Sequence, residues 1–349
     1  MNEPQMLYNA LIMTTRLHKT SAAARCRSLF FAVFIFSSLP LLLNSQNMPW
    51  HWWAVNPGAP YLTLQLQASE QGREGTGILD LSDGRSAPVS WQQKVYGYDD
   101  AREWNLQLEG QDLRLIVSRE ESGDAVLREY LMYRLYNQLS KLSPRVRLVR
   151  LSTGNGKQKQ MRWGYLVESP EMLARRSDAI PFDFINVPPA KLAPVHRDML
   201  GCYQQMTGNK GWSISLLDEI RLIRFPNGDL APVPTGFSRS EWLPLIAGTA
   251  DFDTETWEPD ASALLATLRY FRHKRDDLYQ TVVAFEWLDE AAKLHIFSKM
   301  DHFFQEADAY LNGKAQAYWP LPKGSAVPAF LPAADQPIKN SVNSFDASK

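Results

Sequence analysis

The period of the hydrophobic pattern changes once near Gly123, and this change constrains the fold more than any other feature of the sequence. Before it, apolar and polar residues alternate in three segments, which are residues 61–67, 104–108 and 112–117. That alternation is typical of half-buried β-strands. After it, leucines recur at steps of three and four from Leu127 to Leu142, which predicts an amphipathic helix over residues 125–142.

The segments after this helix indicate a mixed sheet and then a helical region. Residues 145–151 and 162–167 have strand-like patterns on either side of a polar loop at 152–160, so we expect a mixed sheet with the helix packed on it. The elements expected further along are helices at 196–205, 261–272 and within 278–311, and strands at 219–225 and 230–233. This succession is typical of an α+β domain.

The composition supports a folded domain and argues against a nucleic-acid partner. The chain has 349 residues, of which 45% are hydrophobic, and its formal net charge is -1. It can bury a sizeable core, and it has no large excess of basic side chains to neutralise phosphates. The two cysteines, Cys26 and Cys202, are far apart, and no closely spaced Cys/His set suggests a zinc site. We therefore expect no disulfide and a free thiol at Cys202.

The N-terminal region has the order of charge and hydrophobicity found in export signals. An uncharged apolar run at residues 29–43 follows five basic residues, which are Arg16, His18, Lys19, Arg25 and Arg27. A basic region before an apolar one directs the downstream chain across the membrane while the basic end stays in the cytoplasm. We therefore expect an exported protein that contacts the membrane through this segment.

Two outcomes of export remain open. The apolar run is shorter than the roughly 20 residues that span a bilayer, which favours a cleaved signal peptide and a periplasmic location. No A-x-A-like cleavage site follows, however, and Trp50, Trp52 and Trp53 could extend the span as an interfacial aromatic belt. These features favour an uncleaved inner-membrane anchor, with the domain facing the periplasm.

Four regions follow from these patterns. They are a leader at 1–48, a strand-rich region at 49–190, a helical region at 191–319 and a tail at 320–349. The tail is rich in proline and small polar residues, so we expect it to be flexible.

An ordered series of segments resembles the CotH-like atypical kinases, a family named after spore coat proteins. The segments are LREYLMYRLYN at 127–137, PRVRLV at 144–149, WGYLVE at 163–168, GNKGWS at 208–213, RLIR at 221–224 and PVPTGFS at 232–238. The resemblance covers about residues 100–250. It implies a two-lobed kinase-like fold, with a strand-rich N-terminal part and a helical C-terminal part, that would use magnesium and ATP.

The acids that the family uses for chemistry are largely missing. Members have an aspartate in a G-N-x-D-W-S pattern, where this chain has Gly211, and two in a P-Y-D-F-D pattern, where it has Gly236 and Ser238. A His-Asn pair of the family falls near Asp218 and Glu219. Phosphoryl transfer needs such oxygen ligands for magnesium and a carboxylate to orient the nucleophile. The resemblance therefore implies a degenerate site with no catalytic residue and no metal.

Three residues are candidates for nucleotide binding. In kinase-like folds a strand lysine pairs with a helix glutamate to hold phosphates, and Arg114 with Glu129 could imitate that pair. Asn209 retains the family residue at its position. The alternative for Arg114 and Glu129 is a structural ion pair or two unrelated charges.

The sequence thus supports one main functional interpretation and two alternatives. The main reading is an exported, catalytically degenerate binding or scaffolding module that has no cofactor and contacts an unknown envelope protein. The first alternative is an active magnesium- and ATP-dependent phosphotransferase that rebuilt its metal site from Asp218, Asp229, Asp251 or Asp253. The second is a structural envelope protein whose likeness to kinases is incidental.

Overall fold

A computed structural model describes residues 60–68, 73–81, 84–94, 101–153, 160–243 and 261–313. The chain divides into two units. In the first unit, which contains the residues up to Pro60 and Leu81–Arg85, the backbone N–H of Leu81 donates a hydrogen bond to the carbonyl of Arg85. The second unit contains all the helices and strands of the described residues and is the one considered below.

Several sequence predictions lie outside the described residues. They are the leader with its basic residues and apolar run at 29–43, the tryptophans at 50–53, the acidic residues at 251 and 253, and the tail at 320–349. Among the helices in the described ranges, none combines the length and the hydrophobicity that crossing a bilayer requires.

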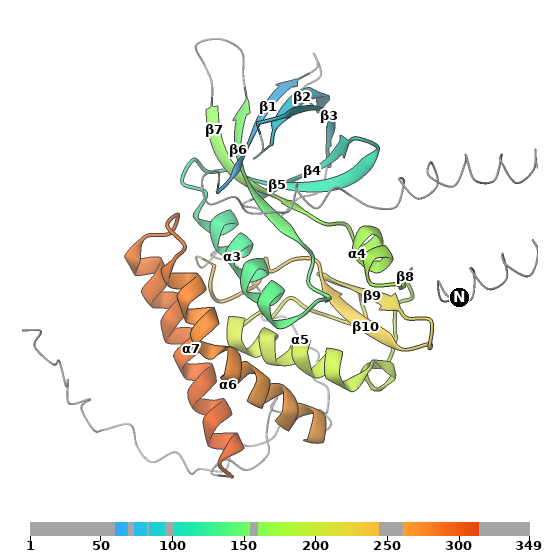
Figure 1. Cartoon of the computed structure of the whole chain (residues 1–349), viewed down its shortest axis with the longest axis vertical. Coiled ribbons are helices and arrows are strands. Elements are labelled where there is room, and N and C mark those ends of the chain that lie inside the picture. The colour runs from blue at the N-terminus through green and yellow to red at the C-terminus, as the bar shows by residue number, and fades with distance from the viewer. Residues whose placement is uncertain are drawn as a thin grey trace, which may run out of the picture. The chain divides into compact units, whose positions relative to one another are not determined.

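A seven-stranded closed barrel forms the strand-rich part of the second unit (Figure 1). Its strands are β1 (Leu62–Ala68), β2 (Glu74–Asp80), β3 (Ser86–Gln93), β4 (Ala101–Leu108), β5 (Gln111–Ser118), β6 (Val146–Thr153) and β7 (Gln160–Val167). Their order is β1-β2-β3-β4-β5-β7-β6, and a parallel pairing of β1 with β6 closes the ring. Closure removes the free edges that an open sheet would present to other chains.

The predicted mixed sheet contains the expected strands β1, β4, β5, β6 and β7, but β2 and β3 were not individually predicted and the topology was incomplete. The alternation in β1 holds, because Leu62, Leu64 and Leu66 are buried while Gln65 and Gln67 are exposed. The predicted polar loop at 152–160 is shorter than expected, because β6 continues through Thr153 and β7 begins at Gln160. Closure depends on the pairing of β1 with the distant β6, which periodicity cannot reveal.

Helix α3 (Asp124–Leu139) follows the barrel strand β5 and connects it to the rest of the unit. Its buried residues include Leu131 and Leu135, as the leucine spacing predicted. The helix ends earlier than the predicted residue 142, and the N–H of Ser140 bonds to the carbonyl of Tyr136 at its end. α3 packs against β5, β6 and β7 and also against the helices α5 and α6 described below.

A second, three-stranded sheet has the order β10-β9-β8. Its strands are β8 (Ile180–Phe182), β9 (Ile220–Arg224) and β10 (Leu230–Pro234). The hairpin of β9 and β10 was predicted, and it pairs Ile220 with Pro234 at one end and Arg224 with Leu230 at the turn. β8 was not predicted.

Short helices and turns surround this sheet. Helix α4 (Pro170–Arg176) begins at Ser169, whose side chain accepts a hydrogen bond from the N–H of Met172, and Pro170 is its first residue. Both are recognised helix-start signals, although the sequence analysis did not use them. A 3-10 turn, η3 (Pro189–Lys191), then leads into helix α5 (Pro194–Thr207), which ends at Gly208 in the left-handed conformation.

Two long helices complete the unit. Helix α6 (Ala261–Val283) extends the predicted helix at 261–272, and α7 (Glu290–Leu311) begins at Asp289, which caps it by accepting a hydrogen bond from Ala292. They pack against each other and against α5, with Phe271 of α6 and Phe303 of α7 in contact at a ring distance of 5.3 Å. The described residues thus form a mixed α/β fold, strand-rich first and helical afterwards, as predicted.

Candidate functional site

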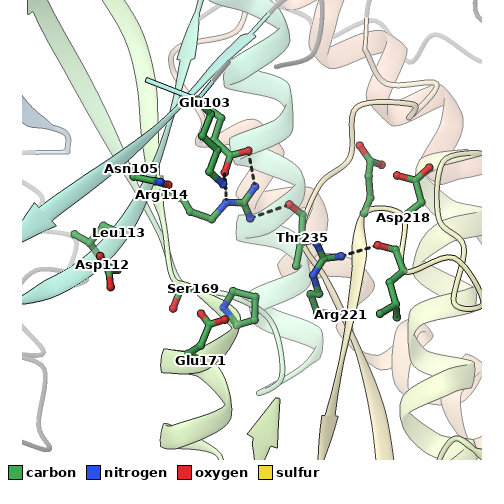
Figure 2. A pocket seen from close by; sticks show the side chains of 14 residues that line it. Glu103, Asn105, Asp112, Leu113, Arg114, Ser169, Glu171, Asp218, Arg221 and Thr235 are labelled. Atoms are coloured by element: carbon green, nitrogen blue, oxygen red, sulfur yellow. Dashed lines mark hydrogen bonds and ion pairs between the residues drawn. The ribbon is translucent and has the colours of Figure 1, made fainter. Parts of the chain in front are cut away.

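A polar cavity of about 610 Å³ lies where the barrel strands β4 and β5 approach the start of α4, the segment leading into β9 and the end of β10. Figure 2 shows its lining. Eight of the lining side chains are acidic or basic, namely Lys94, Glu103, Asp112, Arg114, Glu171, Asp218, Glu219 and Arg221. We call this space the polar cavity.

Arg114 of β5 links the barrel to the end of β10. Its Nε donates to Oε1 of Glu103 at 2.8 Å, its Nη2 to Oε2 of the same carboxylate at 3.3 Å, and its Nη1 to the carbonyl oxygen of Thr235 at 3.3 Å (Figure 2). Burial lowers the pKa of the guanidinium, but the carboxylate of Glu103 outweighs that effect and the net shift is upward. Arg114 and Glu103 thus form a bidentate ion pair, which fixes the plane of the guanidinium.

Glu103 is the partner that the sequence analysis missed. Burial raises the pKa of its carboxyl, while Arg114 and Lys94 lower it, and the net shift is downward. Arg114 faces Asn105 in the pairing of β4 with β5, so Glu103 is its diagonal neighbour on the same face. Diagonal pairs of this kind are within reach of long side chains. A register assigned to the β4-β5 hairpin would have revealed the pair.

Glu129 of α3 was predicted to pair with Arg114. Its side chain is buried, with 7% of its surface exposed, and Oε1 accepts a hydrogen bond of 2.9 Å from the backbone N–H of Phe237. Burial raises the pKa of Glu129 to about 7, and Arg114 is near enough to oppose that shift. The ion pair of Arg114, however, is with Glu103. A role for either residue with a nucleotide remains a prediction.

Glu219 immediately precedes β9 and lines the polar cavity. Its backbone is in the left-handed region, with φ 51°, and 4% of the residue is exposed. Oε1 accepts hydrogen bonds from the N–H of Ser238, at 3.0 Å, and from the hydroxyl of the same serine. Within the described part of the chain, Oε2 accepts no hydrogen bond. Burial raises the pKa of this carboxyl.

The three positions where the resemblance expects aspartates converge on this carboxylate. A Cβ placed on Gly211 would lie 2.8 Å from Oε2 of Glu219, and a Cβ placed on Gly236 would lie 3.0 Å from Oε1. Ser238 is the hydrogen-bond donor to Oε1. The sequence analysis identified the three acids as lost together, and the structure adds that their positions surround one acid, Glu219. The segment from Gly211 to Glu219 meets the segment from Gly236 to Ser238 there, across the β9-β10 hairpin, and no local sequence pattern predicts this contact.

The remaining candidate ligands are arranged less favourably for a metal. Oδ1 of the buried Asn209 accepts from the N–H of Gly211 at 3.0 Å, and its Nδ2 has no partner among the described residues. Asp218 lines the polar cavity, but its Oδ2 accepts from Nη1 of Arg239 at 2.7 Å. Asp229 lies in the turn of the β9-β10 hairpin, at the end away from Glu219.

No arrangement of three or more His, Cys, Asp or Glu side chains in the described ranges could hold a metal ion.

Comparisons with known proteins give little further information. No protein-family model matches the chain, and no curated protein matches it. A solved structure described as the Helicobacter pylori proinflammatory kinase CtkA is similar at a TM-score of 0.39 and 10% identity, over 63% of this chain and 93% of that one. A similarity at that TM-score carries no argument about this chain. The likeness to CotH-like kinases therefore rests on the sequence segments alone.

Proposed function

We propose that this chain is a kinase-like binding module that does not transfer phosphate. The observation that carries the proposal is the position of Glu219, whose carboxylate occupies the space next to Gly211 and Gly236. A side chain at either position would crowd that carboxylate in its present position. A single buried carboxylate with a raised pKa, already bonded to Ser238, stands there in place of the aspartates that the resemblance expects.

This arrangement is poorly suited to a magnesium-bound triphosphate. Magnesium prefers six oxygen ligands in near-octahedral geometry, and phosphoryl transfer depends on charge neutralisation in line with the transferred group. Arg114, the cation best placed to hold phosphates, is committed to Glu103 and to the carbonyl of Thr235. Three of its five N–H donors are already used by these two partners, which leaves fewer for a phosphate.

The proposal is tested on the purified full-length chain with magnesium-ATP at millimolar concentration. We expect no incorporation of labelled phosphate into the chain or added protein substrates, and no rise in the unfolding temperature. Saturation at 100 times Kd would stabilise the folded state by about 2.7 kcal/mol, so even moderate binding would be visible.

Phosphate transfer would reject the proposal and support the phosphotransferase alternative. Its metal ligands would then be sought by replacing Asp218, Asp251 and Asp253 individually with asparagine. The matched control is Glu286→Gln, which changes an exposed acid between α6 and α7 away from the polar cavity.

We also propose that the module works outside the cytoplasm. The apolar run at 29–43 would either anchor it in the inner membrane or be removed as part of a signal peptide. The support is the order of basic and apolar residues in the leader. Protease added to spheroplasts should digest the chain beyond residue 48. Protection until the cells are lysed would reject this location.

A further inference from the structure

Four large apolar side chains lie exposed beside the three-stranded sheet. They are Ile180 in β8, Phe184 and Ile185 in the segment that follows β8, and Leu216, and each has more than half of its surface exposed. A single exposed leucine or isoleucine is ordinary on a soluble protein, whereas a group of them on one surface marks an interaction site.

Contacts within the chain bring the four side chains into one group. The N–H of Asn186 donates to the carbonyl oxygen of Ser215 at 2.6 Å, so the segment after β8 lies beside the segment that carries the exposed leucine. The ring of Phe182, two residues after Ile180 in β8, contacts the ring of Phe184 at a centroid distance of 4.7 Å. We call the four side chains and Phe182 the β8 patch.

The free edge of β8 is unsuited to pairing with a further strand. β8 is the outer strand of its sheet, and Pro181 is the middle one of its three residues. Proline has no N–H to donate, so it is tolerated at a sheet edge and discourages the addition of another strand there. A partner of the β8 patch would therefore be held by side chains.

One charge of each sign accompanies the β8 patch. Arg224 of β9 is the cross-strand partner of Ile180, and its guanidinium lies over the ring of Phe182, 5.6 Å from the centroid. Asp183 is the residue that directly follows β8. Both charged residues are exposed, and neither has an ion-pair partner within the described part of the chain.

We propose that the β8 patch is the face through which two copies of this chain form a symmetric dimer. A two-fold axis brings the same surface of both copies together, so each contact between two different residues occurs twice. On this face Asp183 of one copy would pair with Arg224 of the other, while the apolar side chains of both copies are removed from water. The dimer goes beyond the proposed function, because it does not depend on whether the chain transfers phosphate.

Charge complementarity favours a second copy over the other occupants of such a face. An anionic membrane surface attracts clusters of basic residues, whereas this face has one base and one acid, Asp183, which such a surface repels. A strongly acidic or strongly basic protein would likewise meet one attractive charge and one repulsive charge. A second copy presents an opposite charge to each.

Sedimentation of the full-length chain in non-ionic detergent, over a range of protein concentrations, tests the dimer. The wild type should dimerise as its concentration rises. Asp183→Arg and Arg224→Asp should each weaken the dimer by about ten-fold or more, because each brings two pairs of like charges together. Phe184→Ser should also weaken it, through the loss of an exposed ring. Glu286→Arg, a charge reversal at an exposed position between α6 and α7, should leave the dimer unchanged.

Combined variants distinguish lost charge pairing from damage to the fold. The double variant Asp183→Arg/Arg224→Asp has opposite charges across the axis again and should dimerise as the wild type does. An equal mixture of the two single variants should form a heterodimer, because every charge of one chain then meets an opposite charge of the other. A variant that had merely unfolded would be rescued in neither experiment.

Three outcomes would overturn the proposal. The first is a wild-type chain that stays monomeric at every concentration. The second is a dimer that neither charge reversal weakens, or one that neither the double variant nor the mixture restores. The third is a monomer whose binding to phosphatidylglycerol vesicles is lowered by Phe184→Ser, which would assign the β8 patch to a membrane surface instead.

Discussion

Oε2 of Glu219 lies 2.8 Å from the point where a Cβ on Gly211 would be placed. Real Cβ atoms do not approach other atoms this closely, so a side chain at 211 and the present position of the Glu219 carboxylate exclude each other. The side chain of Arg239 closes the same space, with its Cδ 2.9 Å from that point. An acid at 211 would therefore require the side chains of Glu219 and Arg239 to move from their present positions.

Gly211→Asp should consequently destabilise the fold. Overpacking costs about 1 to 3 kcal/mol, and the like charge of Glu219 adds to it. Chemical denaturation measures the loss. In a Glu219→Ala background the same substitution should cost less, because the two residues compete for one space, whereas in a Glu286→Ala background the cost should be unchanged. Equal costs in all three backgrounds would show that the two side chains do not compete.

Leu131 lies at the centre of the face that α3 buries, with 0% of its surface exposed. Leu131→Ala should lower the free energy of unfolding by about 2 to 5 kcal/mol, through lost transfer energy and the cavity left behind. Leu294→Ala on α7 is the matched control, since that leucine is 66% exposed and should change stability by less than about 0.5 kcal/mol. Similar urea unfolding midpoints for Leu131→Ala and Leu294→Ala would contradict the placement of Leu131 on the buried face of α3.

Most local elements were predictable because their signals lie within a few residues. The alternation in β1, β4 and β5, the leucine spacing of α3 and the hairpin of β9 and β10 all correspond to the observed elements. β2 was harder to recognise as a single strand, because Gly75 and Gly77 interrupt its apolar pattern. These glycines let β1 approach closely, since a Cβ on either would come within 2.5 Å of a β1 carbonyl oxygen.

The site was only partly predictable for a different reason. Arg114 was identified from its strand, yet its partner Glu103 depends on the register of the hairpin, which was not assigned. The convergence of Gly211 and Gly236 on Glu219 depends on the tertiary arrangement of loops that precede and follow the β9-β10 hairpin. Missing acids can be recognised from sequence, but what fills their space cannot.

Cys202 should behave as a buried apolar residue. The structure confirms the prediction of a free thiol, which is 1% exposed within α5, and burial raises its pKa. Thiols react as thiolates, so Cys202 should resist a thiol reagent in the native state and react after denaturation. The assay uses a Cys26→Ser variant so that only one thiol is counted. Prompt labelling of the native variant would show that the helix opens or that the thiol is accessible.

Glu129 should make the stability of the fold depend on pH. Burial raises its pKa to about 7, and Glu219 raises it further, while the N–H of Phe237, the hydroxyl of Tyr165 and the cation of Arg114 oppose the shift. The unfolded chain has the ordinary value of 4.5. Between these values the folded state binds more protons than the unfolded state, so stability falls as pH rises.

The Glu129→Gln variant isolates this effect, because glutamine resembles the protonated acid and can still accept from the N–H of Phe237. Below about pH 4.5 the two chains should differ little, and as pH rises to about 8 the wild type should lose on the order of 3 kcal/mol relative to the variant. Urea unfolding at a series of pH values measures both curves, and Glu286→Gln should follow the wild type. A difference between wild type and Glu129→Gln that does not change with pH would mean that Glu129 keeps an ordinary pKa, and that it is charged in the folded chain at neutral pH.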